Sequence, residues 1–179
     1  TGSLIPLAVI AYRAATGNLG ANPIATALNQ LGLLGLLLLM ASLLCTPLKL
    51  VFGLKWPMRL RKTLGLVGFF TILLHFLVYL VVDHGLNLNV VIEDISKRPF
   101  IALGFTAFLL LVPLALTSTK GALKRLGSAR WRRLHRLVYL AVPLGVVHFF
   151  MRAKADVREP LIYGTVLALL LAARLKKRS

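Results

Sequence analysis

Histidines are the residues of this sequence whose type and spacing could do chemistry in an apolar environment. His75, His135 and His148 lie within long apolar runs, and His84 follows Asp83 at the end of one run. An ionisable side chain in hydrocarbon is costly and by default indicates a function. A lone histidine of this kind can simply bond to a neighbouring helix, but three of them in two runs disfavour that explanation.

Two of these histidines are predicted to lie at nearly equal depth in a membrane. Helices that enter near Thr63 and Arg133 place His75 about 18 Å and His148 about 22 Å along their axes. Two neutral imidazoles that face each other across a bundle can hold a haem iron from both sides. We therefore predict a b-type haem between His75 and His148. The sequence has no Cys-x-x-Cys-His, which excludes covalent c-type attachment.

His135 is a further candidate ligand, about 20 Å from His148 along one helix. This separation resembles that of stacked haems in membrane cytochromes, so the sequence predicts one haem, or two if His135 also binds iron. Thirteen residues turn by about 220° in an ideal helix, although Pro143 lies between the two histidines and can kink it. Arg61 and Lys62 occupy the matching depth, so a second haem needs another ligand, water or an open position. His135 could equally orient a different cofactor.

Other polar or small residues have plainer interpretations. His84 lies about half a helical turn out of phase with His75, and we expect a solvated histidine at the membrane interface. Cys45 is the single cysteine, which excludes an internal disulfide and a cysteine-ligated zinc or iron–sulfur site within the chain. Gly104, like two other glycines in apolar runs, could let a helix or a porphyrin approach closely, and ordinary helix packing is the preferred interpretation.

Composition identifies the environment that these residues occupy. Of 179 residues, 58% are apolar and 15% are charged, with a formal net charge of +17. A soluble domain has about a quarter of its residues charged, and disordered chains are poor in large aliphatic residues. The basic residues separate apolar runs instead of forming a stripe, so they do not indicate nucleic-acid binding. The sequence predicts an integral membrane protein in a lipid bilayer.

The chain divides into six apolar segments, each interpreted as a helix because about 20 apolar residues cross the hydrocarbon. We predict an all-α polytopic bundle with about six transmembrane helices, forming a single domain over residues 1–179. The first helix is expected to be truncated. The segments are 3–15, 28–46, 64–82, 99–117, 134–150 and 160–174.

Charge predicts how these helices cross the membrane. Assigning alternate connections to opposite sides gives one side 16 basic residues and no acids, whereas the other has 6 basic residues and all 5 acids. Because cytoplasmic loops are enriched in Lys and Arg, both termini are predicted to be cytoplasmic. The basic cluster of residues 120–136 is interpreted mainly as a determinant of topology. It could also pair with haem propionates or a flavin phosphate.

A set of short runs occurs in order from about residue 17 to residue 178, and it resembles the MsrQ family, formerly YedZ. The family comprises haem-binding membrane subunits within the ferric reductase-like transmembrane group. Its haem-linked histidines match His75, His135 and His148, whereas His84 matches none. The runs are Ala21-Asn22-Pro23, Thr46-Pro47, Arg61-Lys62-Thr63-Leu64-Gly65-Leu66, Leu74-His75, Lys97-Arg98-Pro99-Phe100, Leu116-Thr117-Ser118-Thr119, Leu126-Gly127, Trp131-Arg132-Arg133-Leu134-His135 and Leu137-Val138-Tyr139.

The resemblance implies an electron conduit in the bacterial inner membrane. Electrons from a cytoplasmic flavin reductase or a membrane quinol would pass to MsrP, a periplasmic molybdopterin enzyme that reduces protein-bound methionine sulfoxide. FMN is also associated with the family, but the resemblance identifies no residue that binds it. The sequence lacks Gly-x-Gly-x-x-Gly, and its outer loops are small, so we expect it to bind neither NAD(P)H nor the methionine sulfoxide substrate.

Two other functions compete with this interpretation. One is a quinol-oxidising or ferric-reducing cytochrome b without an MsrP partner. The other is a membrane scaffold or transporter without a cofactor. Transport sites usually contain paired charges near the middle of the membrane. The apolar segments contain no Asp or Glu, which argues against proton-coupled transport.

Overall fold

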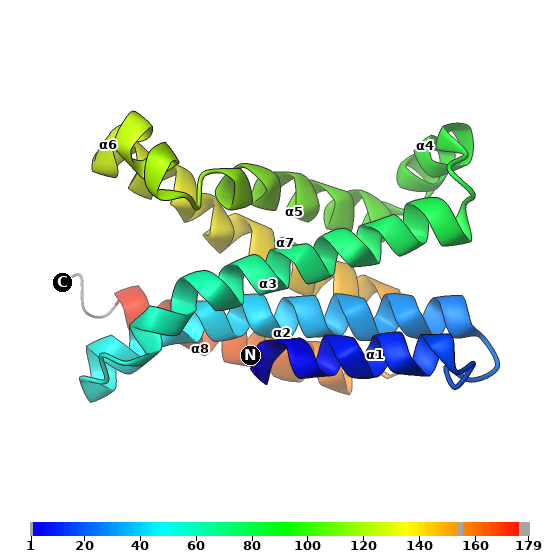
Figure 1. Ribbon diagram of the computed structural model, residues 1–179, viewed down its shortest axis with the longest axis horizontal. Coiled ribbons are helices and arrows are strands. Elements are labelled where there is room, and N and C mark those ends of the chain that lie inside the picture. Colours follow the sequence, from blue (N-terminus) through cyan, green and yellow to red (C-terminus); the bar gives the residue numbers. More distant parts are fainter. Residues whose placement is uncertain (1, 154–155, 176–179) are drawn as a thin grey trace.

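The computed structural model describes residues 2–153 and 156–175, and every regular element in these ranges is a helix (Figure 1). Each of the six predicted apolar segments is helical, so the predicted helical membrane bundle is confirmed. The elements are η1 (Gly2–Leu4), α1 (Ile5–Ala15), α2 (Pro23–Phe52), α3 (Pro57–Leu77), η2 (Val78–Asp83), α4 (Leu88–Lys97), α5 (Pro99–Leu116), α6 (Lys120–Leu134), η3 (His135–Leu137), α7 (Val138–Arg152) and α8 (Arg158–Leu175).

Four helical stretches of the described chain are long and apolar enough to cross a membrane: 23–52, 57–83, 99–116 and 120–152. The second stretch joins α3 to the π-helical η2, and the fourth joins α6 to α7 through the 3-10 turn η3. Helix α1 has only 11 residues, and α8 has 18. The count of six transmembrane helices therefore stays a prediction.

Local sequence explains where the long helices begin and end. Pro23, Pro57 and Pro99 each occupy the first turn of a helix, where the missing N–H costs no hydrogen bond. The Asn22 side chain accepts a hydrogen bond from the Ala25 N–H and caps α2. Gly53 ends α2 in the left-handed conformation, with φ of 69°.

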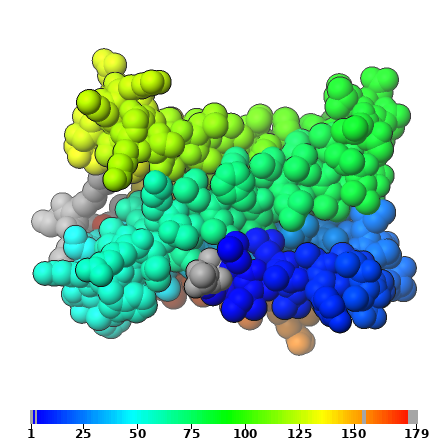
Figure 2. Space-filling model, viewed as in Figure 1, coloured from blue at the N-terminus to red at the C-terminus, as the bar shows by residue number. Residues whose placement is uncertain are grey.

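Two connections between the predicted apolar segments contain helices. The Asn87 side chain caps α4, and the Thr119 side chain caps α6, each by accepting a backbone N–H three residues later. Gly127, with φ of 73°, bends α6 before it continues toward α7. These helices lie at opposite ends of the bundle and rise above α5 in the space-filling view (Figure 2).

The helices pack most closely in two places. One is the contact between α2 and α3, and the other is a buried core that lies between the histidines and the end of the bundle that carries α6. A Cβ on Gly35 would lie 2.5 Å from the Ile72 side chain, so glycine allows α2 and α3 to approach closely. The core joins α2, α5, α7 and α8. Its buried residues are Leu36, Leu39, Met40, Leu43, Leu111, Leu114, Ala141, Val142, Val146 and Leu167. Large apolar side chains such as Phe70 stay exposed, as expected for surfaces that face lipid.

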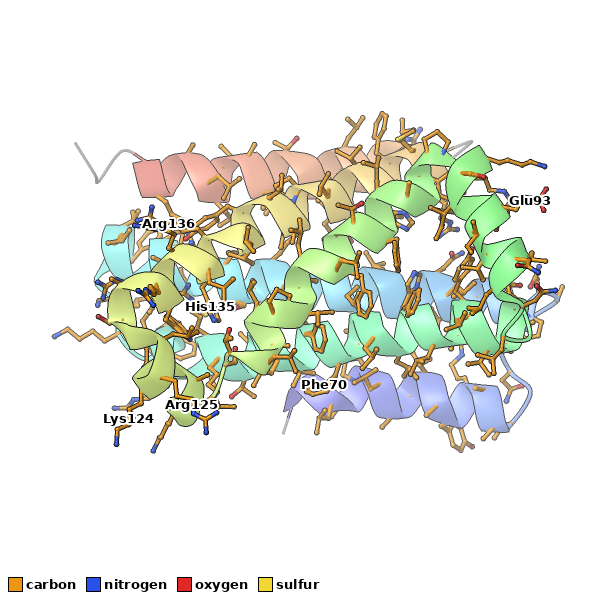
Figure 3. All side chains as sticks on the ribbon, turned by 90° about the horizontal axis from the view of Figure 1, so that it is seen from above. Phe70, Glu93, Lys124, Arg125, His135 and Arg136 are labelled. Carbon is orange, nitrogen blue, oxygen red and sulfur yellow. The ribbon has the colours of Figure 1, made fainter. Side chains whose placement is uncertain are left out.

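The two ends of the bundle differ in charge, because the acidic residues lie at one end only. Lys124, Arg125 and Arg136 lie at the end that carries α6, whereas Glu93 lies on α4 at the opposite end (Figure 3). We call these the basic end and the acidic end. The alternation of loops inferred from the sequence is therefore present, and the positive-inside rule predicts that the basic end is cytoplasmic.

Cysteine labelling tests this orientation. In a Cys45→Ser background, the thiol introduced by Glu93→Cys should react with a membrane-impermeant maleimide in intact spheroplasts. The thiol introduced by Lys124→Cys should react only after lysis. Both positions are exposed, whereas Cys45 is buried. The opposite pattern would reverse the predicted topology, and labelling of both thiols in intact cells would contradict a protein that spans the membrane between them.

Candidate functional site

His75 on α3 and His148 on α7 face each other in the acidic half of the bundle. Their ring centroids are 6.5 Å apart, and their planes are nearly perpendicular at 84°. Because an imidazole nitrogen binds a metal at about 2 Å, two rings on opposite sides of one iron have centroids roughly 6 Å apart. The juxtaposition expected from sequence depth is therefore present, at a separation that suits two axial ligands of one metal.

Both imidazoles are held in the same way, by a backbone carbonyl of the neighbouring helix. His75 Nδ1 donates to the Leu28 carbonyl of α2 at 2.8 Å, and His148 Nδ1 donates to the Phe100 carbonyl of α5 at 2.6 Å. A carbonyl can only accept, so Nδ1 carries the proton in each neutral ring. The Nε2 lone pair of each ring is left for a metal, as in most histidine-ligated sites.

A glycine one turn after each carbonyl provides the space for the ring. A Cβ on Gly32 would lie 3.2 Å from His75 Nδ1, and a Cβ on Gly104 would lie 2.7 Å from His148 Nδ1. The second distance is shorter than real Cβ contacts allow. We call each combination of carbonyl and glycine, Leu28 with Gly32 and Phe100 with Gly104, a histidine notch. Sequence reasoning interpreted Gly104 as ordinary packing and did not single out Gly32.

The two rings border a cavity of about 340 Å³ between α2, α3, α5 and α7, which we call the central cavity. This volume lies within the range of small-molecule and cofactor sites. Aromatic side chains form much of its wall, including Phe76 and Phe108, whose rings stack with centroids 4.9 Å apart. Small residues such as Ala107 and Gly145 line it as well. A flat, mostly apolar ligand suits such walls.

The donor set also limits which metal centre fits. Within residues 2–153 and 156–175, no group of three or more His, Cys, Asp or Glu side chains is placed to hold a bare metal ion. Protein-ligated transition metals usually take three or four side chains. Two opposed histidines therefore suit an iron whose remaining ligands belong to a porphyrin. The residues present fit a haem.

His135 occupies a different position from the other two histidines. It lies in η3 and stacks on Trp131, with ring centroids 3.8 Å apart. Thr117 Oγ1 donates its proton to the Pro113 carbonyl at 2.6 Å, so it accepts from His135 Nε2 at 3.1 Å. The proton of a neutral His135 is thus on Nε2, the reverse of His75 and His148.

The pocket beside His135 is a second cavity of about 250 Å³, which we call the inner cavity. Arg61 and Lys62 line it, as the depth argument expected, and they bring two positive charges close to His135. The inner and central cavities share Leu39 and Leu111 in their walls. The two spaces are therefore consecutive along the bundle axis.

The expectation of a solvated His84 is wrong. Its side chain is only 12% exposed, and Nε2 lies 3.2 Å from Asp94 Oδ2 while Nδ1 lies 3.1 Å from the Tyr79 carbonyl. The π-helical turns of η2 change the helical phase after Leu77, and α4 folds back so that Asp94 meets His84. His84 lies outside both cavity walls.

Comparison with known proteins identifies the family of the chain. A family model described as "Ferric reductase like transmembrane component" matches residues 31–146. The chain is 48% identical to a protein of Rhodospirillum rubrum over 96% of this chain and 83% of that protein. It is also 48% identical to a protein of Deinococcus radiodurans over 98% of this chain and 86% of the relative. Both relatives are named "Protein-methionine-sulfoxide reductase heme-binding subunit MsrQ".

The Gly104 notch makes a specific prediction. Gly104→Ala places a methyl group 2.7 Å from His148 Nδ1 and 2.9 Å from Cε1, so the ring must move away from the Phe100 carbonyl. Overpacking of this kind costs about 1–3 kcal/mol, and where this cost falls on the haem-bound form it weakens binding by about 5-fold to about 150-fold. Haem retained per polypeptide after detergent purification, measured by the pyridine haemochrome assay, should fall.

Gly164→Ala is the matched control. A Cβ there meets only a Val146 methyl at 3.6 Å, which is an ordinary contact outside the cavity walls. We expect this variant to keep the haem content of the unmodified chain. Equal haem retention by the Gly104→Ala and Gly164→Ala proteins would show that the ring does not depend on the notch.

Proposed function

Because the chain belongs to the ferric reductase-like transmembrane family and to its MsrQ haem-binding subunits, we propose that it binds haem b and carries electrons across the bacterial inner membrane. The electrons would pass to a periplasmic MsrP-type methionine sulfoxide reductase. The observation that carries the proposal is the pair of opposed imidazoles, with centroids 6.5 Å apart and each Nδ1 bound to a backbone carbonyl.

His75 and His148 are the proposed axial ligands. With both Nδ1 protons engaged, each ring presents an Nε2 lone pair without having to rotate. Such preorganisation favours binding because less conformational freedom is lost. When bound, a haem held by these two residues would supply one-electron transfer.

The walls of the central cavity would set the properties of the bound group. A flat ligand packed against Phe76, Phe105 and Phe108 would be shielded from water along that wall. Exclusion of water and the hydrogen bonds of axial ligands are two of the means by which a protein tunes a redox potential. The chain's task on this proposal is to position the cofactor and adjust its potential.

His135 is proposed to serve the inner cavity, as the ligand of a second haem or as a residue that orients another cofactor such as FMN. Iron binding by its Nε2 requires release from Thr117, since that nitrogen donates to the hydroxyl. Arg61 and Lys62 favour an electron carrier with negative charge in this space. Electrons from a cytoplasmic flavin reductase or a membrane quinol would enter at this end and continue to the central cavity.

Substitution of the axial ligands tests the haem site. His75→Ala and His148→Ala should each abolish the b-type reduced-minus-oxidised signal of the haem in the central cavity, because one remaining imidazole cannot hold its iron from both sides. Leu74→Ala and Val147→Ala are matched controls, since both side chains are exposed neighbours that lie outside the cavity walls. Both controls should keep the spectrum.

Haem stoichiometry separates the possible roles of His135. If the chain binds one haem per polypeptide and His135→Ala retains it, then His135 is not a haem ligand and would serve another cofactor. Two haems, one of which is lost in His135→Ala, would assign iron to the inner cavity. A well-folded chain without any haem would contradict the electron-transfer proposal and favour a membrane scaffold.

Electron delivery can be tested with purified components. Under anaerobic conditions, a catalytic amount of an MsrP-type reductase should reoxidise the reduced protein in lipid nanodiscs completely only when a peptide containing methionine sulfoxide is present. Omission of the peptide is the control, and the readout is the decay of the reduced b-type absorption. Reoxidation by a ferric chelate but not by the reductase would favour a ferric-reducing cytochrome without an MsrP partner.

A further inference from the structure

The wall of the central cavity changes from apolar to polar along the bundle axis. Toward the basic end it is formed by core side chains such as Leu36, Leu39 and Leu111. Toward the acidic end, beyond the two histidines, it contains its charged groups: Asp83, Asp94, Arg98 and Arg152. Haem is itself amphiphilic, because its two propionate carboxylates lie on one edge of an otherwise apolar ring.

Two arginines at this end carry positive charge into the cavity wall. Arg152 is the last residue of α7, one turn after His148, and it makes no ion pair within the part of the chain that the structure describes. Arg98 directly precedes α5, and its Nε donates to Asp94 Oδ1 at 3.2 Å. That contact leaves the two terminal nitrogens of its guanidinium available to another acceptor.

The acids at the same end have partners that offset their charge. Besides the Arg98 contact, Asp94 Oδ2 accepts from Tyr79 Oη at 3.3 Å and from His84 Nε2 at 3.2 Å. Asp83 lies 3.5 Å from His84 Nδ1. Asp94 therefore accepts hydrogen bonds on both of its oxygens. Its role is to hold the Arg98 side chain, and its partners reduce the repulsion that it would exert on a bound anion.

We propose that Arg98 and Arg152 bind the two propionates of the haem and thereby fix which way round it lies. This inference rests on the proposed haem site. Arginine suits the role because its planar fork pairs with carboxylates by two parallel hydrogen bonds. The propionate edge then lies at the acidic end, where a partner outside the membrane can approach it. Asp94 is a positioning residue that holds the Arg98 side chain.

The alternative is that the basic cluster of residues 120–136 pairs with these propionates. The central cavity does not support this, because none of its wall residues belongs to that cluster. The cluster lies at the opposite end, beyond the core that closes the apolar half of the cavity (Figure 3). A haem turned the other way would place two carboxylates among Leu36, Leu39 and Leu111, where an unpaired charge is strongly disfavoured.

The test compares Arg98→Gln and Arg152→Gln with neighbouring substitutions that also remove one positive charge. Lys97→Gln and Arg158→Gln are the matched controls, since neither residue lines the cavity. Two quantities are measured on the haem-loaded protein: the rate of haem transfer to apomyoglobin, and the midpoint potential from a spectroelectrochemical titration. Arg98→Lys and Arg152→Lys, which keep the charge, provide a second pair in case the glutamine variants do not fold.

We expect each glutamine variant to release haem about tenfold faster than its control. The midpoint potential should also fall, because a nearby positive charge stabilises the reduced iron. A tenfold decrease in the reduction equilibrium constant corresponds to about 59 mV. The lysine variants should retain most of the potential but release haem faster than the unmodified protein, since a lysine cannot form the paired hydrogen bonds.

Haem dimethyl ester identifies the propionates as the target. On chain expressed without haem and reconstituted with the ester, the glutamine variants should release the porphyrin at the same rate as the unmodified chain. An equal acceleration with haem and with the ester would overturn the proposal, as would variants that match their controls. Failure of the unmodified chain to bind any haem would instead overturn the proposed function itself.

Discussion

The hydrogen bonds from imidazole Nδ1 to helix carbonyls are the interaction on which the central site depends. Hydrocarbon offers no water to an imidazole N–H, so the chain must supply an acceptor. A side chain one turn after each of these carbonyls would occupy the space of the imidazole ring. Because residues 32 and 104 are glycines, the ring can reach the carbonyl. The bond then fixes the tautomer, which leaves Nε2 of each ring unprotonated and able to bind a metal.

The same unit occurs twice and accounts for the arrangement of four helices. In each unit a histidine-bearing helix, α3 or α7, runs antiparallel to a carbonyl-bearing helix, α2 or α5. The separation of the rings then depends on how the two units pack, which is set by core residues such as Leu39, Leu111 and Val142. Arg174 of α8 follows the same rule for buried polar groups, since its guanidinium bonds to Tyr139 Oη and to the Leu43 carbonyl.

The sequence was sufficient to predict features that depend on the geometry of a single helix and not on how helices pack. The rise per residue of a helix is constant, so the depth of His75 and His148 could be inferred from the ends of their apolar runs. The histidine notches could not be inferred in this way, because the role of Gly104 depends on the His148 ring, which belongs to another helix. His84 was misjudged for a related reason: a period of 3.6 residues does not continue through η2, and no local pattern shows that α4 returns to it.

The inner site differs from the central one in how its histidine is held, and this difference has consequences for the order in which the sites fill. Main-chain carbonyls fix His75 and His148, whereas His135 is held by the Thr117 hydroxyl, a side chain that can rotate. Binding of iron by His135 Nε2 must first break that hydrogen bond, at a cost of about 0.5–1.5 kcal/mol. The central site requires no such step and offers two ligands rather than one. Haem should therefore fill the central site first, and a second haem bound through His135 Nε2 requires that nitrogen to exchange Thr117 for iron.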